Sequence, residues 1–538
     1  MRRKLRLAGA LAAAVMAGML PITAAGAATP AAPASASASP SPAAASAATP
    51  AVRDVPGCAE EQPATFNNGS PAPWVGCNSR SGIQGIEGSN AVNSRGTIFQ
   101  ASGVLDKDGR AGLARSRDGG KTWQRVTLPV EFSDVIGFVQ VDPATNRVFF
   151  MSIAKFFGPG AGSTNPIGYS DDDGNTWHVT RIGGATNGEP NTFGDLGSIF
   201  VGPPPKGTKT TGYPNVVYTC NVTPYPSFGP DFQCWRSLDG GKTFQRPSAT
   251  KPTFPQADCK PVNGPGGSVT QPSIIIPTRG LTAPDGTVYV AISACGQFVV
   301  GSSKDAGTTF TWNPVTDARV DIDQDILKDQ QANLPGCAGS IAGAGCPEVF
   351  QLYGQQRLAR DANGTLYFTF NRHQTLLSVS KDNGKTWTQP TAVSAPGLLS
   401  VFSSVVAQGQ GRVGLSYFGR KDGSKDWNGY LAVIDHADNP NTRTIATAAV
   451  SAPTNPLMPN RCCGSAVLIP PPGSTEATYY NLMEHGGLSF APDGTLWAAF
   501  FRDSTRDPNN TQSAAYEIVG GHLAPSTPSW WPSWPWGS

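Results

Sequence analysis

One eight-residue phrase occurs five times in the chain. Every copy begins with Ser, ends with Trp or Phe and fits the pattern S-x-D-x-G-x-T-[WF]. The copies are Ser116–Trp123, Ser170–Trp177, Ser237–Phe244, Ser303–Phe310 and Ser380–Trp387. Five full matches define a repeat protein, whose fold is read from the spacing of its repeats. The chain is therefore expected to place similar structural units in succession.

The phrase predicts a hairpin turn that is held together by its own side chains. The Asp carboxylate can accept backbone N–H bonds across the turn, Gly supplies a positive φ, and the Ser and Thr hydroxyls can bind the remaining backbone groups. The aromatic residue then begins the returning strand and offers a large apolar face for burial. Each copy therefore predicts two antiparallel strands.

The phrase resembles the Asp box, or BNR repeat, of the sialidase superfamily. In that family each box joins the third and fourth strands of a β-propeller blade, at the periphery and away from the central pocket. The resemblance implies an all-β fold, a single β-propeller of four-stranded blades in which the box Asp residues are structural. It implies no activity, because Asp boxes occur in glycosidases, in sorting receptors and in proteins without a known reaction.

The composition also indicates an all-β chain with many turns. Gly (62 residues) and Pro (48 residues) are abundant, charged residues make up 14%, and amphipathic helices are not recognisable. A folded region of this length would ordinarily suggest about three domains. A propeller overrides that expectation, because it is one closed unit of many blades.

Apolar runs that follow turn residues count the units independently of the boxes. There are seven: Thr97–Ala101, Arg147–Ile153, Val216–Cys220, Thr287–Ile292, Thr365–Phe370, Arg412–Tyr417 and Thr495–Phe501. Shorter strands precede most of them, as at Val135–Val141, Ser273–Ile276, Ser403–Ala407 and Gly487–Phe490. A box follows each of the first five runs, and degenerate hairpins are expected after the last two, around Asp435–Asp438 and Gly520–Gly521. We predict seven blades, with six as the alternative because sialidase catalytic domains have six.

The two ends of the chain differ in composition from the rest. Residues 1–27 have basic residues, an apolar run and a small-residue cleavage site, which is typical of a secretory signal peptide. Residues 28–54 are rich in Ala, Pro and Ser and predict a disordered linker. The propeller is expected over residues 55–523, followed by a Trp/Pro-rich tail over residues 524–538 whose Trp residues could stack on sugar rings.

Charge and export restrict the partners. Loss of the signal peptide removes four basic residues and no acidic one, which changes the formal net charge from +2 to −2. We therefore expect no nucleic-acid partner, and no later apolar run is long enough for a membrane span. The mature chain is expected to be an extracellular monomer whose partner is a carbohydrate or extracellular polymer, with a protein as the alternative.

Ten cysteines in an exported chain favour disulfides over metal ligands. Proximity in sequence suggests the pairs Cys58–Cys77, Cys220–Cys234, Cys259–Cys295 and Cys337–Cys346. Cys462 and Cys463 are adjacent; each pairs elsewhere, or they form a vicinal bridge, or they make a rigid turn at a ligand pocket. The Asp321–Asp329 segment begins D-x-D-x-D, but Ile326 and Ala332 stand where an EF-hand loop has Gly and Glu. We expect no metal and no cofactor, with calcium at this segment as the alternative.

Functional residues of a propeller are expected on the face where the loops between second and third strands and between blades converge. The polar candidates there are Asp134, Glu189, Asp195, Asp258, Glu348, Arg372, His373, Arg420, Arg461, Glu484, His485, Arg502 and Asp503. Three of them, Arg372, Arg420 and Arg502, each follow the aromatic end of a second strand. Similar positions in three successive blades could aim three guanidiniums at one carboxylate or sulfate. The alternative is that each Arg stacks on a neighbouring Phe or pairs with a local Asp such as Asp503.

The resemblance to sialidases does not extend to their catalytic motif. Those enzymes bind the sugar carboxylate with three arginines, protonate the leaving group with an Asp and use a Tyr activated by a Glu. The F/Y-R-I-P signature is missing here, because Arg181-Ile182 is followed by Gly183. The catalytic residues are therefore unknown, with Asp134, Asp195 and Glu484 as candidates. The sequence favours a glycan-binding or cell-wall-polymer-binding propeller, and the alternative is a sialidase-like exo-glycosidase acting on an anionic sugar.

Overall fold

The structure is a computed structural model of the 538-residue chain. It describes residues 60–85, 88–105, 111–132, 137–152, 165–182, 195–222, 232–247, 262–264, 267–269, 276–277, 279–294, 297–319, 357–459, 466–468, 478–480, 486–503 and 516–526. The chain divides into residues 1–50 and residues 51–538. All described residues belong to the second unit, so the expected signal peptide, linker and most of the tail lie outside them.

The described residues form strands connected by turns, with a single 3-10 helix, η1 (Val130–Phe132). The first half of the strands is β1 (Gln62–Phe66), β2 (Pro71–Gln84), β3 (Ser89–Val92), β4 (Ile98–Leu105), β5 (Ala111–Ser116), β6 (Gln124–Arg125), β7 (Gly137–Val141), β8 (Val148–Ser152), β9 (Asn165–Ser170), β10 (His178–Ile182), β11 (Asp195–Gly202), β12 (Val216–Val222), β13 (Phe232–Ser237), β14 (Val262–Gly264), β15 (Gly267–Val269) and β16 (Ile276–Pro277). The second half is β17 (Leu281–Thr282), β18 (Val288–Ala294), β19 (Gln297–Ser303), β20 (Thr311–Arg319), β21 (Leu358–Arg360), β22 (Leu366–Arg372), β23 (Gln374–Ser380), β24 (Thr391–Ala392), β25 (Leu398–Gln408), β26 (Arg412–Lys421), β27 (Asn428–Asp435), β28 (Thr444–Ala449), β29 (Ala466–Leu468), β30 (Thr478–Tyr480), β31 (Leu488–Phe490), β32 (Leu496–Asp503) and β33 (Tyr516–Pro525).

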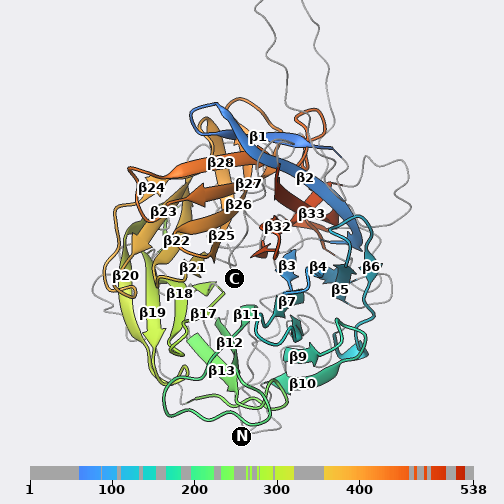
Figure 1. Ribbon diagram of the computed structural model, residues 1–538, viewed down its shortest axis with the longest axis vertical. Coiled ribbons are helices and arrows are strands. Elements are labelled where there is room, and N and C mark those ends of the chain that lie inside the picture. Colours follow the sequence, from blue (N-terminus) through green and yellow to red (C-terminus); the bar gives the residue numbers. More distant parts are fainter. Residues whose placement is uncertain are drawn as a thin grey trace, which may run out of the picture. The chain divides into compact units, whose positions relative to one another are not determined.

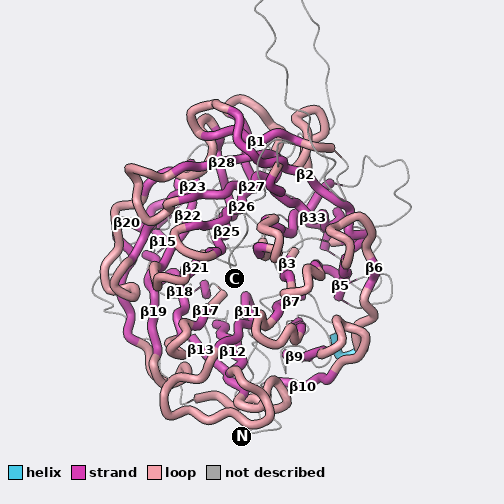
Figure 2. The backbone as a smooth tube through the Cα atoms, in the orientation of Figure 1, coloured by secondary structure: helices cyan, strands magenta, loops and turns pink. Residues whose placement is uncertain are grey.

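Consecutive strands pair antiparallel into a series of small sheets. The sheets β3-β4-β5-β6, β7-β8-β9-β10 and β21-β22-β23-β24 have four strands each, β11-β12-β13 has three, and β16 and β17 both pair with β18 in β18-β19-β20. Within residues 51–538 the sheets follow one another around a common centre (Figures 1 and 2). The first strand of each strand group lies next to its neighbours: β3 contacts β7, β7 contacts β11, β11 contacts β17, β17 contacts β21, β21 contacts β25, and β31 contacts both β25 and β3. This closed succession of antiparallel sheets is a β-propeller.

The core lies between the sheets, because both faces of most strands are buried. On β22, Phe368 and Phe370 pack against Phe298 of the preceding sheet. Tyr367, one position out of phase, packs with Val413 and Leu415 of the following sheet. Side chains alternate between the two faces of a strand, so a strand between two sheets is mostly apolar on both faces. This explains why the seven second strands are visible in the sequence as continuous apolar runs, and all seven are strands in the structure.

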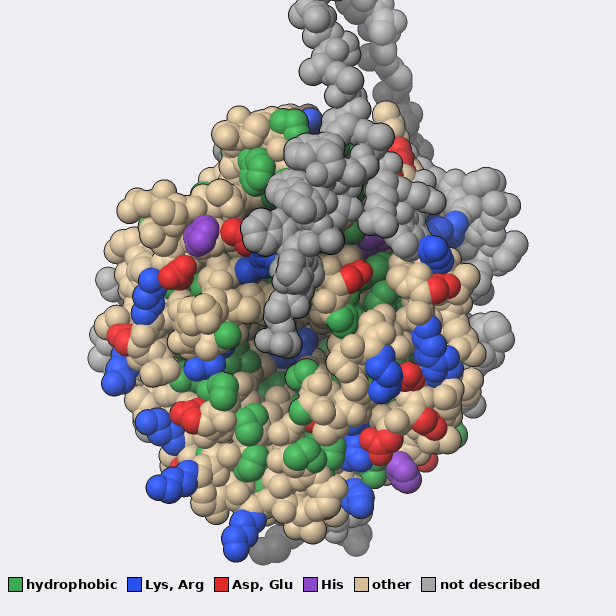
Figure 3. Space-filling model, in the orientation of Figure 1, with side chains coloured by type: hydrophobic (Ala, Val, Ile, Leu, Met, Phe, Trp, Pro, Cys, Tyr) green, Lys and Arg blue, Asp and Glu red, His purple; other side chains and the backbone are tan. Residues whose placement is uncertain are grey.

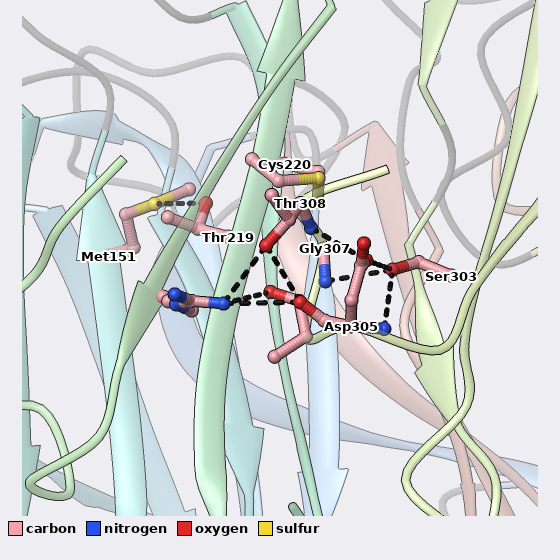
Figure 4. Close-up of a disulfide and its surroundings, with 10 residues drawn as sticks. Met151, Thr219, Cys220, Ser303, Asp305, Gly307 and Thr308 are labelled. Atoms are coloured by element: carbon pink, nitrogen blue, oxygen red, sulfur yellow. Dashed lines mark hydrogen bonds between the residues drawn. A yellow bond between two sulfur atoms is a disulfide. The ribbon is translucent and has the colours of Figure 1, made fainter. Parts of the chain in front are cut away.

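The five repeats share one hydrogen-bond pattern. In each, the Ser Oγ accepts the Gly N–H at 2.7–2.9 Å and donates to the Asp Oδ1 at 2.7–2.8 Å. The Thr N–H donates to the same Oδ1 at 2.8–2.9 Å, and the Thr Oγ1 donates to Oδ2 at 2.5–2.7 Å. Figure 4 shows the part of this arrangement that Ser303, Asp305 and Gly307 form. The clamp agrees with the sequence prediction, except that the Thr hydroxyl binds the carboxylate rather than the backbone.

The N-terminal strands complete the last sheet. One nine-stranded sheet has the order β25-β26-β27-β28-β1-β2-β33-β32-β31, so β2 pairs with β33 from Trp74 opposite Pro525 to Gln84 opposite Glu517. Within this sheet, β1 pairs with both β2 and β28 and so connects the strands β25–β28 to the last strands of the chain. The two ends of the folded region therefore meet in one sheet, which closes the ring.

The hairpin expected around Gly520–Gly521 is wrong, because both residues lie inside the continuous strand β33. These glycines are required for close packing and not for a turn. A Cβ on Gly521 would lie 2.5 Å from the ring of Phe500, and one on Gly520 would lie 2.7 Å from Nε2 of Gln100. The other degenerate turn is confirmed, since β27 ends at Asp435 and a turn leads to β28.

One of the expected disulfides lies within the described residues. Cys220 and Cys234 are opposite each other on β12 and β13 and are bonded, with their Cα atoms 4.1 Å apart (Figure 4). Cys77 on β2 is also disulfide-bonded, and its expected partner Cys58 lies outside the described residues. The other predicted pairs, and the adjacent Cys462 and Cys463, lie outside them too.

Candidate functional site

The three arginines singled out in the sequence lie at corresponding strand ends. Arg372 is the last residue of β22, and Arg420 and Arg502 are each the last but one of β26 and β32. They are the second strands of three successive strand groups, the last two of which belong to the nine-stranded sheet, and each runs antiparallel to the first strand of its group. On the face in view in Figure 3, the surface is hollowed near the centre, with Lys or Arg and hydrophobic side chains beside the hollow.

Arg372 contacts the preceding sheet. Its Nη2 donates to the backbone carbonyl of Asp317 on β20 at 3.2 Å, and its guanidinium lies 6.0 Å from the centre of the Phe370 ring. The chain turns immediately after it, at His373, which has a left-handed φ of 57°. The His373 carbonyl accepts the Ser400 N–H of the next sheet at 2.7 Å, so this turn is fixed on both sides.

A buried polar network supports the same turn from the other side. Asn371 donates to the Ser400 carbonyl at 3.2 Å and to the Thr375 hydroxyl at 3.1 Å, and its Oδ1 accepts both the N–H and the hydroxyl of Ser403 at 3.0 Å. Each of these side chains is at least 92% buried. Satisfied buried networks rigidify the segments they join, so Arg372 projects from a rigid strand end.

Arg420 is 8% exposed and lies within its own sheet. Its Nη1 donates to the Ser424 carbonyl at 2.7 Å, and its guanidinium lies 5.5 Å from the centre of the Trp427 ring. This is the stacked arrangement that the sequence left open as an alternative, with Trp427 in place of a neighbouring Phe.

Arg502 belongs to an ion cluster at the closure of the ring. Its Nη1 is 3.1 Å from Oε1 of Glu517, while Arg80 binds the other oxygen, Oε2, through Nε at 3.0 Å and Nη2 at 2.8 Å. The Glu517 side chain is 8% exposed, that of Arg502 is 21% exposed and that of Arg80 is 48% exposed. One nearly buried carboxylate thus holds two guanidiniums, and the cluster keeps one net positive charge. Glu517, rather than Asp503, is the partner of Arg502.

The structure therefore places the three arginines at equivalent strand ends and gives each a different protein partner. It adds Arg80 and Glu517 to the candidate site, which sequence reasoning missed. The separation of 437 residues between them leaves no local signal. A further cation, Arg357, is fully buried before β21 with its guanidinium 5.2 Å from the centre of the Phe298 ring, and burial lowers its pKa to about 9.

The candidate catalytic carboxylates are described only in part. Asp195 begins β11 opposite Val222, and the structure describes its backbone only. Asp134 and Glu484 lie outside the described residues, as do Glu189, Asp258, Glu348, Arg461 and His485. The Asp321–Asp329 segment considered for calcium lies outside them as well. Among the residues that are described, no three His, Cys, Asp or Glu side chains are grouped to hold a metal ion, and no helix is long and apolar enough to cross a membrane.

No protein-family model and no curated protein matches the chain. Among solved structures, it is similar to the intramolecular trans-sialidase from Ruminococcus gnavus, at 14% identity and a TM-score of 0.38 over 82% of this chain and 96% of that one. It is similar to the NanB sialidase from Streptococcus pneumoniae at 11% identity and a TM-score of 0.36, over 83% and 70% of the two chains. It is similar to the fucose-specific lectin from Aleuria aurantia at 10% identity and a TM-score of 0.36, over 69% of this chain and 99% of the lectin. TM-scores below 0.5 at such identities assign neither a fold nor an activity to this chain.

Proposed function

We propose that the chain is an extracellular β-propeller of seven blades, five of which carry an Asp box, and that it binds an anionic glycan or cell-wall polymer on the face carrying Arg372, Arg420 and Arg502. The signal-peptide pattern of residues 1–27 supports the location. The seven second strands, each with an inner partner, support the blade number. The fourth strand of the seventh blade is then β2, supplied by the N-terminus.

The observation that carries the proposed ligand class is the environment of Arg502. Its side chain is about four-fifths buried, and Glu517 Oε1 is the one hydrogen-bond acceptor that it contacts within the described part of the chain. A guanidinium has five N–H donors in a fixed fork that suits carboxylate and sulfate. Glu517 therefore orients Arg502 while leaving it further donors for an anionic group.

The test compares affinities for a sialoside, a glucuronide and a neutral glycoside by isothermal titration calorimetry. A charge-assisted bond in a desolvated site contributes about 1.5–3 kcal/mol, so Arg502→Ala should weaken binding of the anionic sugars roughly ten- to a hundredfold. Arg502→Lys should restore little of it, because an ammonium lacks the fork.

Arg412→Ala is the matched control. Arg412 lies at the opposite end of a second strand and pairs with Asp435 at 2.6 Å, so its removal should leave sugar affinity unchanged. Equal affinity of the wild-type protein for neutral and anionic glycosides, or unchanged binding by a folded Arg502→Ala variant, would contradict the proposal.

The same sugar panel, offered as fluorogenic glycosides, also separates binding from catalysis. Release of the fluorescent aglycone would favour the alternative, a sialidase-like exo-glycosidase, and would direct attention to Asp134, Asp195 and Glu484. Binding without release supports the non-catalytic function.

A further inference from the structure

Three arginines contact a single residue, Asp173, at the periphery of the sheets β3-β4-β5-β6 and β7-β8-β9-β10. Asp173, in the second repeat, has Arg95 Nη2 2.5 Å from Oδ1 and Arg117 Nη2 3.7 Å from Oδ2. Arg115 donates to the Asp173 backbone carbonyl, and Asn93 Nδ2 donates to Oδ1 at 3.0 Å. Lys and Arg side chains gather over β5 and β6 in this part of the surface (Figure 3).

The fold explains one of the three arginines. Arg115 immediately precedes a box Ser, and it reaches the box of the next sheet through Asn175 Oδ1 at 2.7 Å. Arg236 likewise precedes the Ser of the third repeat and reaches the repeat of the next sheet. It donates to the Asp305 and Ala306 carbonyls at 3.2 and 3.1 Å. Arg115 is therefore a connection between sheets and is 6% exposed. Burial lowers its pKa, and the neighbouring Arg117 charge lowers it further.

Arg95 and Arg117 are not needed for the connection that Arg115 makes between the two sheets. The side chains of Arg95 and Arg117 are 51% and 49% exposed, and within the described part of the chain Asp173 is the one acidic residue that each contacts. Because they touch the two oxygens of one carboxylate, their guanidiniums lie close together. Asp172, the neighbouring carboxylate, also interacts with Arg115, so three arginines and two Asp residues leave the cluster with one net positive charge. Two half-exposed forks side by side are suited to a second oxyanion.

We propose that Arg95 and Arg117 form a peripheral site for the sulfate or carboxylate groups of an acidic extracellular polysaccharide, separate from the site at the strand ends. The choice of a polysaccharide uses the extracellular location proposed above. The cluster is small, whereas nucleic acid is bound through many phosphate contacts along an extended basic surface. A single exposed contact of this kind is weak, and a polymer gains affinity by engaging several such contacts at once.

Heparin, a sulfated polysaccharide, is the probe, with elution from a heparin column and titration calorimetry as readouts. Arg95→Ala/Arg117→Ala should elute at lower salt and bind about tenfold more weakly, which corresponds to two exposed ionic contacts. The control is Lys242→Ala/Lys385→Ala, which removes the same charge from exposed box positions elsewhere. That control should behave as the wild type.

Asp173→Asn should change heparin affinity in the opposite direction to the arginine substitutions. Asp173 has a left-handed φ of 57°, which Asn tolerates, and the substitution removes the carboxylate that competes with the ligand. Heparin affinity should therefore rise severalfold, whereas a purely structural role for the cluster predicts no gain. Unchanged affinity in both arginine and Asp173 variants, or equal losses in the arginine and lysine variants, would overturn the proposal.

Two further measurements test the class of ligand and distinguish the two proposed sites. Binding to vesicles that contain anionic lipid, without binding to heparin, would overturn the choice of a polysaccharide. Arg95→Ala/Arg117→Ala should keep the wild-type affinity for the small sialoside and glucuronide, which Arg502→Ala should weaken, so failure at either site can be told from failure at the other.

Discussion

At the scale of single residues, the repeat encodes more geometry than its fixed letters reveal. The residue between Asp and Gly is variable, yet it has a positive φ in every copy: Gly119 (69°), Asp173 (57°), Gly240 (73°), Ala306 (55°) and Asn383 (61°). The next residue is always Gly, also with positive φ. The carboxylate clamp holds two left-handed residues in succession, even where one has a β-carbon. The sequence predicted the turn and the clamp, but it could not predict strain at a position occupied by four residue types.

Removing one clamp should destabilise the fold in a manner that depends on pH. Hydrogen bonds from the Thr386 side chain and backbone lower the pKa of Asp382 to about 2, below its value of about 3.9 in an unfolded chain. The ionised carboxylate therefore stabilises the fold above about pH 4, and this contribution is lost as the pH falls toward 2. Asp382→Asn should lower stability at pH 7 by about 0.5–1.5 kcal/mol, because the Thr386 donors that lose the carboxylate are exposed to water.

Thermal melts from pH 7 to pH 2 measure this effect. The difference between the wild type and Asp382→Asn should shrink as the solution is acidified from pH 4 to pH 2. Sugar affinity at pH 7 should stay the same, because the clamp is peripheral; a stable variant that had lost sugar binding would show that the box residue is functional.

At the scale of elements, the strand pattern was largely predictable because a strand packed between two sheets must be apolar on both faces. The last strand was not, since Gly520 and Gly521 are typical of a turn in sequence. Glycine is needed here because of tertiary packing: Phe500 of the adjacent strand occupies the space that a side chain on Gly521 would need. The candidate site, too, was predictable only in part. Arg502 was predicted from the end of its strand, whereas its partners Glu517 and Arg80 come from strands whose pairing no local pattern indicates.

Gly521→Ala should therefore destabilise the protein by overpacking. Its Cβ would lie 2.5 Å from two ring atoms of Phe500, which forces side-chain or backbone shifts that cost about 1–3 kcal/mol. In Gly486→Ala, the new Cβ has the Ser404 Oγ at 3.5 Å as its nearest neighbour, so this control should change little. Chemical denaturation of both variants gives the comparison, and equal stabilities would mean that the strand can move aside.

At the scale of the whole folded unit, stability depends on the sheet that joins the two ends of the chain. Strand β2 covers the edge of β33, β1 covers β28, and Asn78 donates to the Val450 carbonyl at 2.6 Å. The Cys77 disulfide and the Arg80–Glu517 ion pair act on the same strand. The sequence predicted the number of second strands, but the strand that completes the last sheet comes from the far end of the chain and carries no box.

Deleting residues 60–84 should open this sheet although all five repeats remain. Uncovered edges of β33 and β28 offer backbone groups to other chains, so the variant should form oligomers and lose a single cooperative melting transition. Size-exclusion chromatography and circular dichroism report these two properties. A variant lacking residues 28–50 is the control and should remain monomeric; a monomeric, cooperatively melting 60–84 deletion would show that the ring does not need β2.

The pairing of β2 with β33 also sets an order of events during synthesis. Arg80 leaves the ribosome 437 residues before Glu517, an interval of roughly twenty seconds to a minute and a half at about 5–20 residues per second. During that time the edge of β2 (fourteen residues) that faces β33 has no partner strand, while the repeats that follow can already fold against one another. The chain must therefore keep one edge of β2 open until its last strand is made, and a cell that exports the chain unfolded would postpone ring closure until after translocation.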